Sequence, residues 1–283
     1  MIIWLASYPK SGNTWVRFFI TSLLLNTKDF SLKDSTKLIG QFPMKRHYDN
    51  LGVNINFNNL NEVSKYWLEA QKKINSDNKI RILKTHNALC NLNDNFFSLP
   101  SLMLGAIHVI RDPRNIITSI KNYYGFKNIN DTLKFLIKEN NSIFPQIENK
   151  NNFALPQLIG SWKEHYHSWK QVKKNYLLVK YEKLIDNSFL EFKKIADYIG
   201  SIINRNFSDD QINTAIKLTD FKRLQNLEKK YGFQEAPKNQ ESNKRRNFFY
   251  LGENNNWKKI LDQKTTYRII KEFKKEMEAL NYI

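Results

Sequence analysis

A lysine, a serine, a glycine and a threonine stand close together near the N-terminus, in the segment YPKSGNTW (8–15). In the common nucleotide-binding loop the lysine follows the last glycine and is itself followed by Ser or Thr. Here Lys10 precedes Gly12, so the order differs. The apolar run 2–6 predicts a strand before this segment, and the apolar spacing of 14–25 predicts a helix after it. A loop at a helix N-terminus favours anion binding, because free amide groups and the helix dipole attract negative charge.

Lys84 and His86 stand two residues apart in LKTH (83–86), at the end of a second apolar run. An extended backbone points both side chains to the same face of a sheet. A histidine at such a position could act as a general base, because its ordinary pKa lies near neutrality. Taken alone, this segment fits a solvated or structural histidine better.

Two more predicted strands end in side chains that could bind a nucleotide. Arg111 ends one strand and Ser119 follows on a helix; an arginine fork and a hydroxyl suit a phosphate, although Arg111 alone would more often pair with a carboxylate such as Asp112. Tyr181 ends the other and could offer its ring and hydroxyl, or simply pack. The carboxyl ends of parallel strands form the ligand crevice of an open sheet. Together the four segments predict a site for a ligand with two phosphate groups and a flat base.

The elements that must position these residues alternate along the chain. Strands are predicted at 2–6, 79–86, 176–182 and the first part of 104–115, and helices at 14–25, 114–125, 155–173, 188–200 and 263–280. This alternation predicts an α/β fold with a central parallel sheet flanked by helices, in one domain over residues 1–283. The polar, basic stretch 232–256 is predicted to be a long loop, either a lid or disordered.

Composition limits the classes of protein that fit. The 283 residues are 41% hydrophobic, enough for a large core, and carry 45 Lys and Arg against 27 Asp and Glu, a formal charge of +18. Such a surface suits anionic partners, although frequent Lys use along the whole chain explains the total equally well. The single Cys90 excludes an internal disulfide and suits a reducing, cytoplasmic compartment. No signal peptide or membrane span is apparent. No carboxylate and histidine cluster has metal-ligand spacing, so we expect no metal.

In their order and spacing, these motifs resemble those of sulfotransferases that use 3'-phosphoadenosine 5'-phosphosulfate (PAPS). That family reads YPKSGTTW, KTH, RNPKD…S, SW…H…WW and YE; here the motifs stand as YPKSGNTW, KTH, RDPRNIITS, SWKEHYHSW and KYE. LTDFKRL (218–224) resembles the family's TSF segment. The matches run from residue 8 to about residue 257. The resemblance implies a P-loop-like phosphosulfate-binding loop after the first strand, PAPS as co-substrate and a small-molecule, glycan or lipid acceptor, with no nucleic acid partner.

The resemblance also implies a role for each matching residue. His86 would be the catalytic base, Lys84 would neutralise charge on the transferring group, and Lys10 would contact the phosphosulfate bridge. The residues implied in cofactor binding are Lys10, Ser11, Gly12, Asn13 and Thr14 at the 5' end; Trp15, Tyr181, Thr219 and Phe221 at the adenine; and Arg111 and Ser119 at the 3'-phosphate.

The closing motif of the family, RKGxxGDWK, is changed here to YLGENNNWK (250–258). The two bases that clamp the 3'-phosphate are missing, and Arg245 or Arg246 is expected to replace them in a lid that folds over the nucleotide. Variable loops near 30–60, 87–100, 124–155 and 232–256 are expected to shape the acceptor pocket. Phe42, Tyr48, Tyr123, Tyr124 and Phe126 are candidates to line this pocket or to pack in the core.

Two other classes of protein remain open at this point. One is a nucleotide or small-metabolite kinase on a P-loop-type scaffold, although no lysine follows the loop glycine and no carboxylate for Mg²⁺ is evident. The other is a non-catalytic protein that binds polyanions through its positive charge. Neither the acceptor nor the oligomeric state follows from the sequence.

Overall fold

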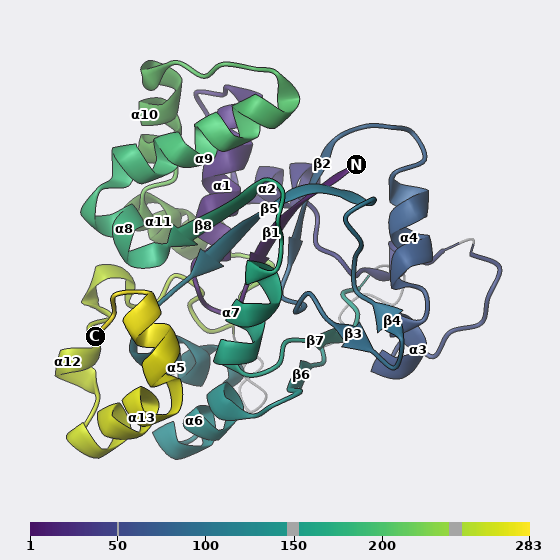
Figure 1. Cartoon of the computed structure of the whole chain (residues 1–283). Coiled ribbons are helices and arrows are strands. Elements are labelled where there is room, and N and C mark those ends of the chain that lie inside the picture. Colours follow the sequence, from purple (N-terminus) through teal and green to yellow (C-terminus); the bar gives the residue numbers. More distant parts are fainter. Residues whose placement is uncertain (50, 146–152, 238–244) are drawn as a thin grey trace.

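The computed structural model describes residues 1–49, 51–145, 153–237 and 245–283, in which a parallel sheet lies among helices (Figure 1). Its four strands are β1 (Ile2–Ser7), β2 (Arg81–Thr85), β5 (Met103–Ile110) and β8 (Tyr176–Lys180). The strand order is β2-β1-β5-β8, and every neighbouring pair is parallel. The predicted α/β fold with a central parallel sheet flanked by helices is confirmed.

Helices make up most of the rest of the described chain. They are α1 (Asn13–Leu25), α2 (Leu32–Leu38), α3 (Leu60–Ser64), α4 (Trp67–Ile74), α5 (Pro113–Tyr124), α6 (Ile129–Ile137), α7 (Trp162–Lys170), α8 (Tyr181–Asp186), α9 (Ser188–Ile203), α10 (Asp209–Leu218), α11 (Phe221–Tyr231), α12 (Trp257–Ile260) and α13 (Gln263–Ala279). The 3₁₀ helices η1 (Lys45–His47) and η2 (Gly252–Asn254) and the short antiparallel pairs β3 (Asn91–Leu92) with β4 (Asn95–Phe96) and β6 (Ser142–Ile143) with β7 (Gln157–Leu158) complete these elements.

The two faces of the sheet bury alternate residues of each strand. Ile3 and Leu5 of β1 pack against Phe19 of α1 and Phe192 of α9 on one face. Trp4, between them in sequence, lies in a second cluster on the opposite face, with residues of α4 and α7. Figure 1 shows α1, α9 and α10 on one side of the sheet and α7 on the other. A strand with both faces covered reads as a continuous apolar run, which is why IIWLA was recognisable.

A further apolar cluster lies beside the carboxyl edge of the sheet and holds the segment that follows α11. Phe233 and Ala236 of this segment are buried with Phe18 of α1, Leu224 of α11 and Phe249. This cluster fixes residues 233–236 against α1, although they belong to no helix or strand.

The carboxyl ends of all four strands meet at one edge of the sheet. The chain passes from β1 to β2 on one side and, after β5, to β8 on the other, so the strand order reverses between β1 and β5. Ligands of open α/β sheets bind at such a switch point. The loop after β1, His86 after β2, Arg111 after β5 and Tyr181 after β8 all lie at this edge.

Two predicted element boundaries were wrong. The helix predicted at 155–173 begins only at Trp162, because Ser161 caps it and forms a capping box with Glu164, and residues 157–158 form β7 instead. The strand predicted at 176–182 ends at Lys180, and Tyr181 opens α8. The described part of the predicted loop 232–256 contains only η2, and residues 238–244 of that prediction lie outside the described ranges.

Candidate active site

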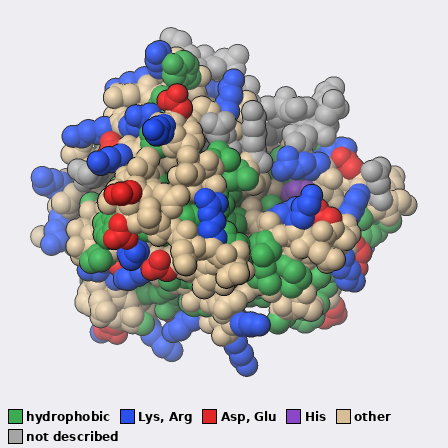
Figure 2. Space-filling model, turned by 90° about the horizontal axis from the view of Figure 1, so that it is seen from above, with side chains coloured by type: hydrophobic (Ala, Val, Ile, Leu, Met, Phe, Trp, Pro, Cys, Tyr) green, Lys and Arg blue, Asp and Glu red, His purple; other side chains and the backbone are tan. Residues whose placement is uncertain are grey.

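A cavity of about 1290 Å³ opens at the carboxyl edge of the sheet and brings most of the predicted site residues together. Eleven of them line it: Lys10, Gly12, Asn13, Thr14, Trp15, Lys84, His86, Arg111, Ser119, Tyr181 and Phe221. Ser11 and Thr219 are fully buried and are not among the lining residues. Figure 2 shows basic side chains spread over much of one face of the molecule, several of them near a hollow in which a histidine is visible.

The loop after β1 presents a helix N-terminus to this cavity. Gly12 precedes α1 with φ 102° and gives it no side-chain cap, and the first turn carries no acidic residue. A Cβ at Gly12 would lie 2.4 Å from Cδ2 of Tyr181, so a side chain has no room there. The exposed amide end of α1, with the Lys10 side chain beside it, favours an anion over a cation.

Asn13 and Ser11 lie on the inner side of the same loop. Asn13 Nδ2 donates to the carbonyl oxygen of Leu5 at 3.0 Å and to Ser7 Oγ at 3.1 Å, which fixes the start of α1 to β1. The Asn13 side-chain oxygen and the Ser11 hydroxyl are buried and have no hydrogen-bond partner among the described residues. Buried polar atoms without partners are costly, so both are candidates for ligand or water contacts.

The ammonium group of Lys10 is held between two aromatic rings. Its Nζ lies 3.8 Å from the ring centre of Phe248 and 4.5 Å from that of Tyr123. Burial, together with the positive charges of Lys84 and Arg111, lowers the pKa of Lys10 to about 7. A nearby anion would raise this pKa, so binding of an anion would leave Lys10 fully protonated at pH 7.

His86 is oriented by the backbone of the neighbouring strand. Its Nδ1 lies 2.8 Å from the carbonyl oxygen of Ser7, and its amide donates to Gln157 Oε1 at 2.8 Å. A carbonyl oxygen only accepts, so Nδ1 carries the proton and Nε2 keeps its lone pair. Burial and the charge of Lys84 lower the pKa of His86 well below its ordinary value, so the ring is neutral at pH 7. Nε2 of His86 can therefore accept a proton.

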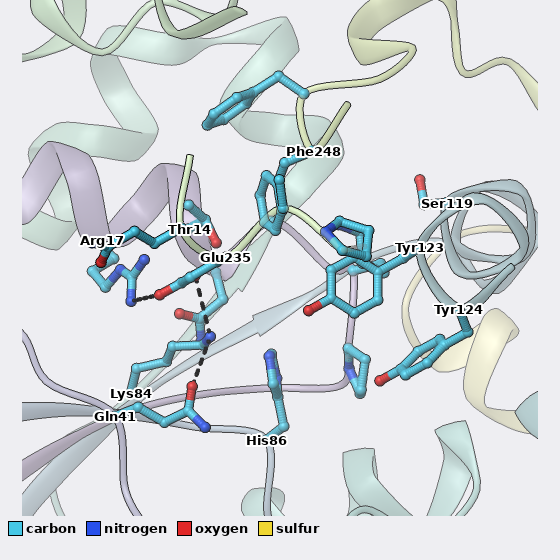
Figure 3. A pocket seen from close by; sticks show the side chains of 18 of the residues that line it. Thr14, Arg17, Gln41, Lys84, His86, Ser119, Tyr123, Tyr124, Glu235 and Phe248 are labelled. Carbon is cyan, nitrogen blue, oxygen red and sulfur yellow. Dashed lines mark hydrogen bonds and ion pairs between the residues drawn. The ribbon is translucent and has the colours of Figure 1, made fainter. Parts of the chain in front are cut away.

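Lys84, two residues before His86, takes part in a separate chain of polar contacts (Figure 3). Its Nζ donates to Gln41 Oε1 at 3.3 Å and lies 3.7 Å from Glu235 Oε2. Glu235 Oε1 in turn lies 2.7 Å from Arg17 Nη1. Burial lowers the pKa of Lys84, and the carboxylate of Glu235 opposes this effect.

Arg111 is buried and forms no ion pair within 4 Å among the described residues, although an aspartate follows it in sequence. Asp112 pairs with Arg114 at 2.7 Å and caps α5 by accepting the Arg114 amide at 2.8 Å. The guanidinium of Arg111 instead stacks 4.1 Å from the ring centre of Tyr181 and donates to the carbonyl oxygen of Lys10 at 3.3 Å. Its Nε has no hydrogen-bond partner among the described residues, which leaves a donor for an anion.

Ser119 is held by a residue from the C-terminal part of the chain. Asn255 Nδ2 donates to Ser119 Oγ at 3.3 Å and to the carbonyl oxygen of Asn115 at 2.6 Å, and its Oδ1 accepts from Thr118. The segment with the altered closing motif is thereby fixed to α5. Ser119 Oγ accepts in this contact, so its own proton is available for an anion.

The predicted adenine end of the cavity is aromatic. Trp15 contacts Tyr181 edge-on at 5.8 Å, and its indole nitrogen is buried without a partner in the described residues. The ring of Phe221 packs closely against Gly252: a Cβ added at Gly252 would lie 2.4 Å from this ring. The hydroxyl of Thr219, the residue after α10, donates to the Ala215 carbonyl at 2.7 Å, and its contact with the adenine stays a prediction.

The two arginines expected to clamp the 3'-phosphate are engaged with backbone carbonyls. Arg245 Nη1 donates to the carbonyl oxygens of Gln234 and Ala236, and Arg246 Nη1 donates to that of Asn122 at 3.1 Å. Both line the cavity. Their clamp role stays a prediction, and residues 243 and 244 of the expected lid lie outside the described ranges.

The acceptor aromatics separate into two groups. Tyr123 and Tyr124 line the cavity, whereas Phe42 and Tyr48 are buried in the second core cluster and Phe126 packs on Tyr124 and Phe135. Sequence reasoning missed Gln41, Gln157, Glu235 and Asn255. The sequence carries no local signal for Gln41 or Asn255, whereas the Ser-x-x-Glu box at 161–164 could have placed the helix start after Gln157.

Neither a metal-binding cluster nor a membrane-spanning helix is present in the described ranges. No group of three or more His, Cys, Asp or Glu side chains could hold a metal ion. None of their helices is both long and apolar enough to cross a bilayer.

Comparison with known proteins agrees with this fold. The profile of the Sulfotransferase domain family matches residues 2–281. The chain belongs to this family.

Among curated relatives, Sulfotransferase 2A6 of Mus musculus is 25% identical over 225 residues, and 3-beta-hydroxysteroid sulfotransferase of Cavia porcellus is 26% identical over 228 residues. These alignments cover 77% and 78% of this chain but only 64% and 65% of the relatives. The chain thus matches less than two thirds of their length.

Solved structures show the same fold. A retinol dehydratase in complex with androsterone and 3'-phosphoadenosine 5'-phosphate (PAP) superposes with a TM-score of 0.60 at 15% identity, covering 98% of this chain and 80% of that one. The mouse sulfotransferase SULT7A1 in complex with PAP gives 0.54 at 18% identity, covering 97% and 83%.

Proposed function

We propose that this protein transfers the sulfuryl group of PAPS to a hydroxyl, or an amine, of a small acceptor. One observation carries the proposal: a neutral His86 whose Nε2 keeps its lone pair lines the same cavity as Lys10, Lys84 and Arg111. A base beside several cations suits a reaction in which an acceptor loses a proton while negative charge moves to a phosphate.

The transfer can be written with His86 and the two lysines. The acceptor oxygen attacks sulfur while its proton passes to His86 Nε2. The bond from sulfur to the bridging oxygen breaks, and this oxygen leaves as part of the 5'-phosphate of PAP. Lys10 and the amide end of α1 stabilise the charge that develops there, and Lys84 faces the oxygens of the sulfuryl group. A well-placed donor of this kind typically contributes about 2.7–4 kcal/mol.

The nucleotide site follows from the same residues. Ser11, Gly12, Asn13 and Thr14 would hold the 5'-phosphate end, although the buried Ser11 would reach it only through its backbone or a small shift. Trp15, Tyr181 and Phe221 would contact the adenine, with Thr219 beside them.

Arg111 and Ser119 would bind the 3'-phosphate. ATP carries no 3'-phosphate, so a buried Arg111 whose Nε has no partner among the described residues favours a sulfotransferase over a kinase.

For the acceptor, the cavity offers a mainly apolar wall from Tyr124, Ile143, Phe144, Phe153 and Ala154. The retinol dehydratase of the same fold holds androsterone and PAP. We therefore propose a small hydroxylated apolar acceptor rather than a nucleic acid, with glycans and lipids included in the screen. One domain over residues 1–283 and a cytoplasmic location, which suits the free Cys90, belong to the proposal.

The test is incubation with labelled PAPS and panels of hydroxylated and amino acceptors, scored for labelled product and for PAP. Thermal shift with PAP, ATP with Mg²⁺, or a polyanion separates the three classes of function. Stabilisation by PAP with label transfer supports the proposal. Stabilisation only by ATP with Mg²⁺ would make the protein a kinase candidate, and stabilisation only by the polyanion would point to a binding protein; either overturns it.

A further inference from the structure

Glu235 connects two buried cations at the edge of the cavity. Its Oε1 lies 2.7 Å from Arg17 Nη1 and its Oε2 lies 3.7 Å from Lys84 Nζ. The side chains of Arg17 and Lys84 are only 1% and 8% exposed. Figure 3 shows the carboxylate between the two cations.

The segment that delivers Glu235 is held in place on both sides of this residue. Phe233 and Ala236 are buried in the cluster around Phe18 of α1. Arg245 donates to the carbonyl oxygens that flank Glu235, those of Gln234 and Ala236. The carboxylate therefore reaches Lys84 from a fixed backbone rather than from a freely moving side chain on the surface.

The surroundings of Lys84 are otherwise unfavourable to its positive charge. Burial lowers its pKa, the charge of Arg17 lowers it further, and Glu235 acts in the opposite direction. Burial alone would raise the pKa of Glu235, but Arg17 and Lys84 outweigh it and hold this pKa at about 2, so the carboxylate is ionised throughout the neutral range. Among the described residues, the titratable or charged groups that act on Lys84 are Arg17 of α1, Lys10 of the loop after β1, His86 after β2 and Glu235.

We propose that Glu235 is a positioning residue for Lys84: it keeps the buried ammonium group charged and holds it toward the group that is transferred. The inference rests on the proposed sulfuryl transfer, in which Lys84 must carry a proton to face the sulfuryl oxygens. Gln41 completes the arrangement by accepting a hydrogen bond from the same ammonium group.

The direct test measures the protonation of Lys84 and needs no acceptor. The protein is labelled with ¹³C-lysine, the Lys84 signal is assigned from its loss in Lys84→Arg, and its pKa is read from an NMR titration. Glu235→Gln keeps the side-chain shape but removes the charge, so the pKa of Lys84 should fall by about one unit or more, a tenfold change in its acid constant. In Glu235→Asp the carboxylate is withdrawn by one methylene, so a smaller fall is expected.

Glu228→Gln is the matched control. The carboxylate of Glu228 accepts the amides of Phe248 and Phe249 at 2.7 and 2.9 Å, so this variant disturbs the same region without touching the partner of Lys84. It should leave the Lys84 pKa in place. An unchanged pKa in Glu235→Gln, or an equal fall in Glu228→Gln, would overturn the proposal. If the Gln variant does not fold, an unchanged pKa in Glu235→Asp would do the same.

Turnover then links the pKa to the reaction. Once an acceptor is known, kcat of Glu235→Gln should approach the parent value at low pH and fall about tenfold as the pH rises past the lowered pKa of Lys84. A loss by the same factor at every pH, or a gain in kcat, would contradict positioning. If the parent itself does not transfer sulfuryl while the NMR shift is present, the proposed function fails and the Glu235–Lys84 coupling stands.

Discussion

The Nδ1 atom of His86 lies 2.8 Å from the carbonyl oxygen of Ser7, a contact that leaves Nε2 unprotonated. We predict that His86→Ala lowers kcat by about 10²–10⁴-fold, the usual cost of losing a general base. The affinity for PAP, measured by calorimetry, should stay close to that of the parent. Ser7→Ala removes a hydroxyl that accepts from Asn13 Nδ2 and lies 3.2 Å from His86 Nδ1, but it leaves the carbonyl, so most of the turnover should remain. Full turnover in a folded His86→Ala protein would contradict the role of the base.

Lys10 should make PAP binding depend on pH. With its pKa lowered to about 7, this lysine is charged below neutrality and loses its proton as the pH rises. A phosphate favours the charged form, so affinity should fall by up to about tenfold per pH unit above 7. Lys10→Arg stays charged throughout and should flatten the profile. Calorimetry between pH 6 and 8.5 makes the comparison; parallel profiles for both proteins would exclude Lys10 as the cause.

Arg111 should determine the preference for a 3'-phosphate. The parent is expected to bind PAP more tightly than adenosine 5'-phosphate, and Arg111→Ala should lose most of that difference. A charge-assisted hydrogen bond contributes about 1.5–3 kcal/mol, which corresponds to roughly tenfold or more in affinity. Arg111→Lys keeps the charge without the fork and should be intermediate. The role of Arg111 is wrong if the parent binds both nucleotides equally well.

Gly12 should tolerate no side chain. Gly12→Ala would place a Cβ 2.4 Å from the Tyr181 ring at a φ of 102°, so a loss of about 1–3 kcal/mol in the free energy of unfolding is expected, with weaker PAP binding. Adding Tyr181→Ala should relieve the clash but not the backbone strain. Chemical denaturation of both single variants and the double variant gives the coupling. Strict additivity would show that the clash is not the cause.

The expected lid is tested through Arg245 and Arg246. If either arginine leaves its backbone carbonyl to bind the 3'-phosphate, the double Ala variant should bind PAP about tenfold more weakly or worse. Hydrogen exchange in the segment from 245 to 257 should slow when PAP is added. Unchanged exchange together with parental affinity would leave the 3'-phosphate to Arg111 and Ser119.

The sequence predicted those parts of the site that lie at strand ends. Buried parallel strands are short apolar runs, and a polar residue such as Lys84 or Arg111 marks where each run stops. Residues that reach the site from distant segments gave no such signal: Gln157 meets the His86 amide across 71 residues, and Asn255 meets Ser119 across 136. Glu235 likewise stands in a polar stretch whose function depends on tertiary packing of Phe233.

The ion pair between Asp112 and Arg114 keeps the Asp112 carboxylate from neutralising the neighbouring Arg111. Arg114 also donates to the carbonyl oxygen of Tyr282 and stacks on Trp257, so the C-terminal segments keep it in place. A chain that lost Arg114 would leave the carboxylate of the buried Asp112 unpaired, one residue from the arginine that we propose binds the 3'-phosphate. If Arg111 sets the nucleotide specificity, that specificity is open to change from Arg114, which does not line the cavity, and an otherwise intact set of motifs would not reveal it.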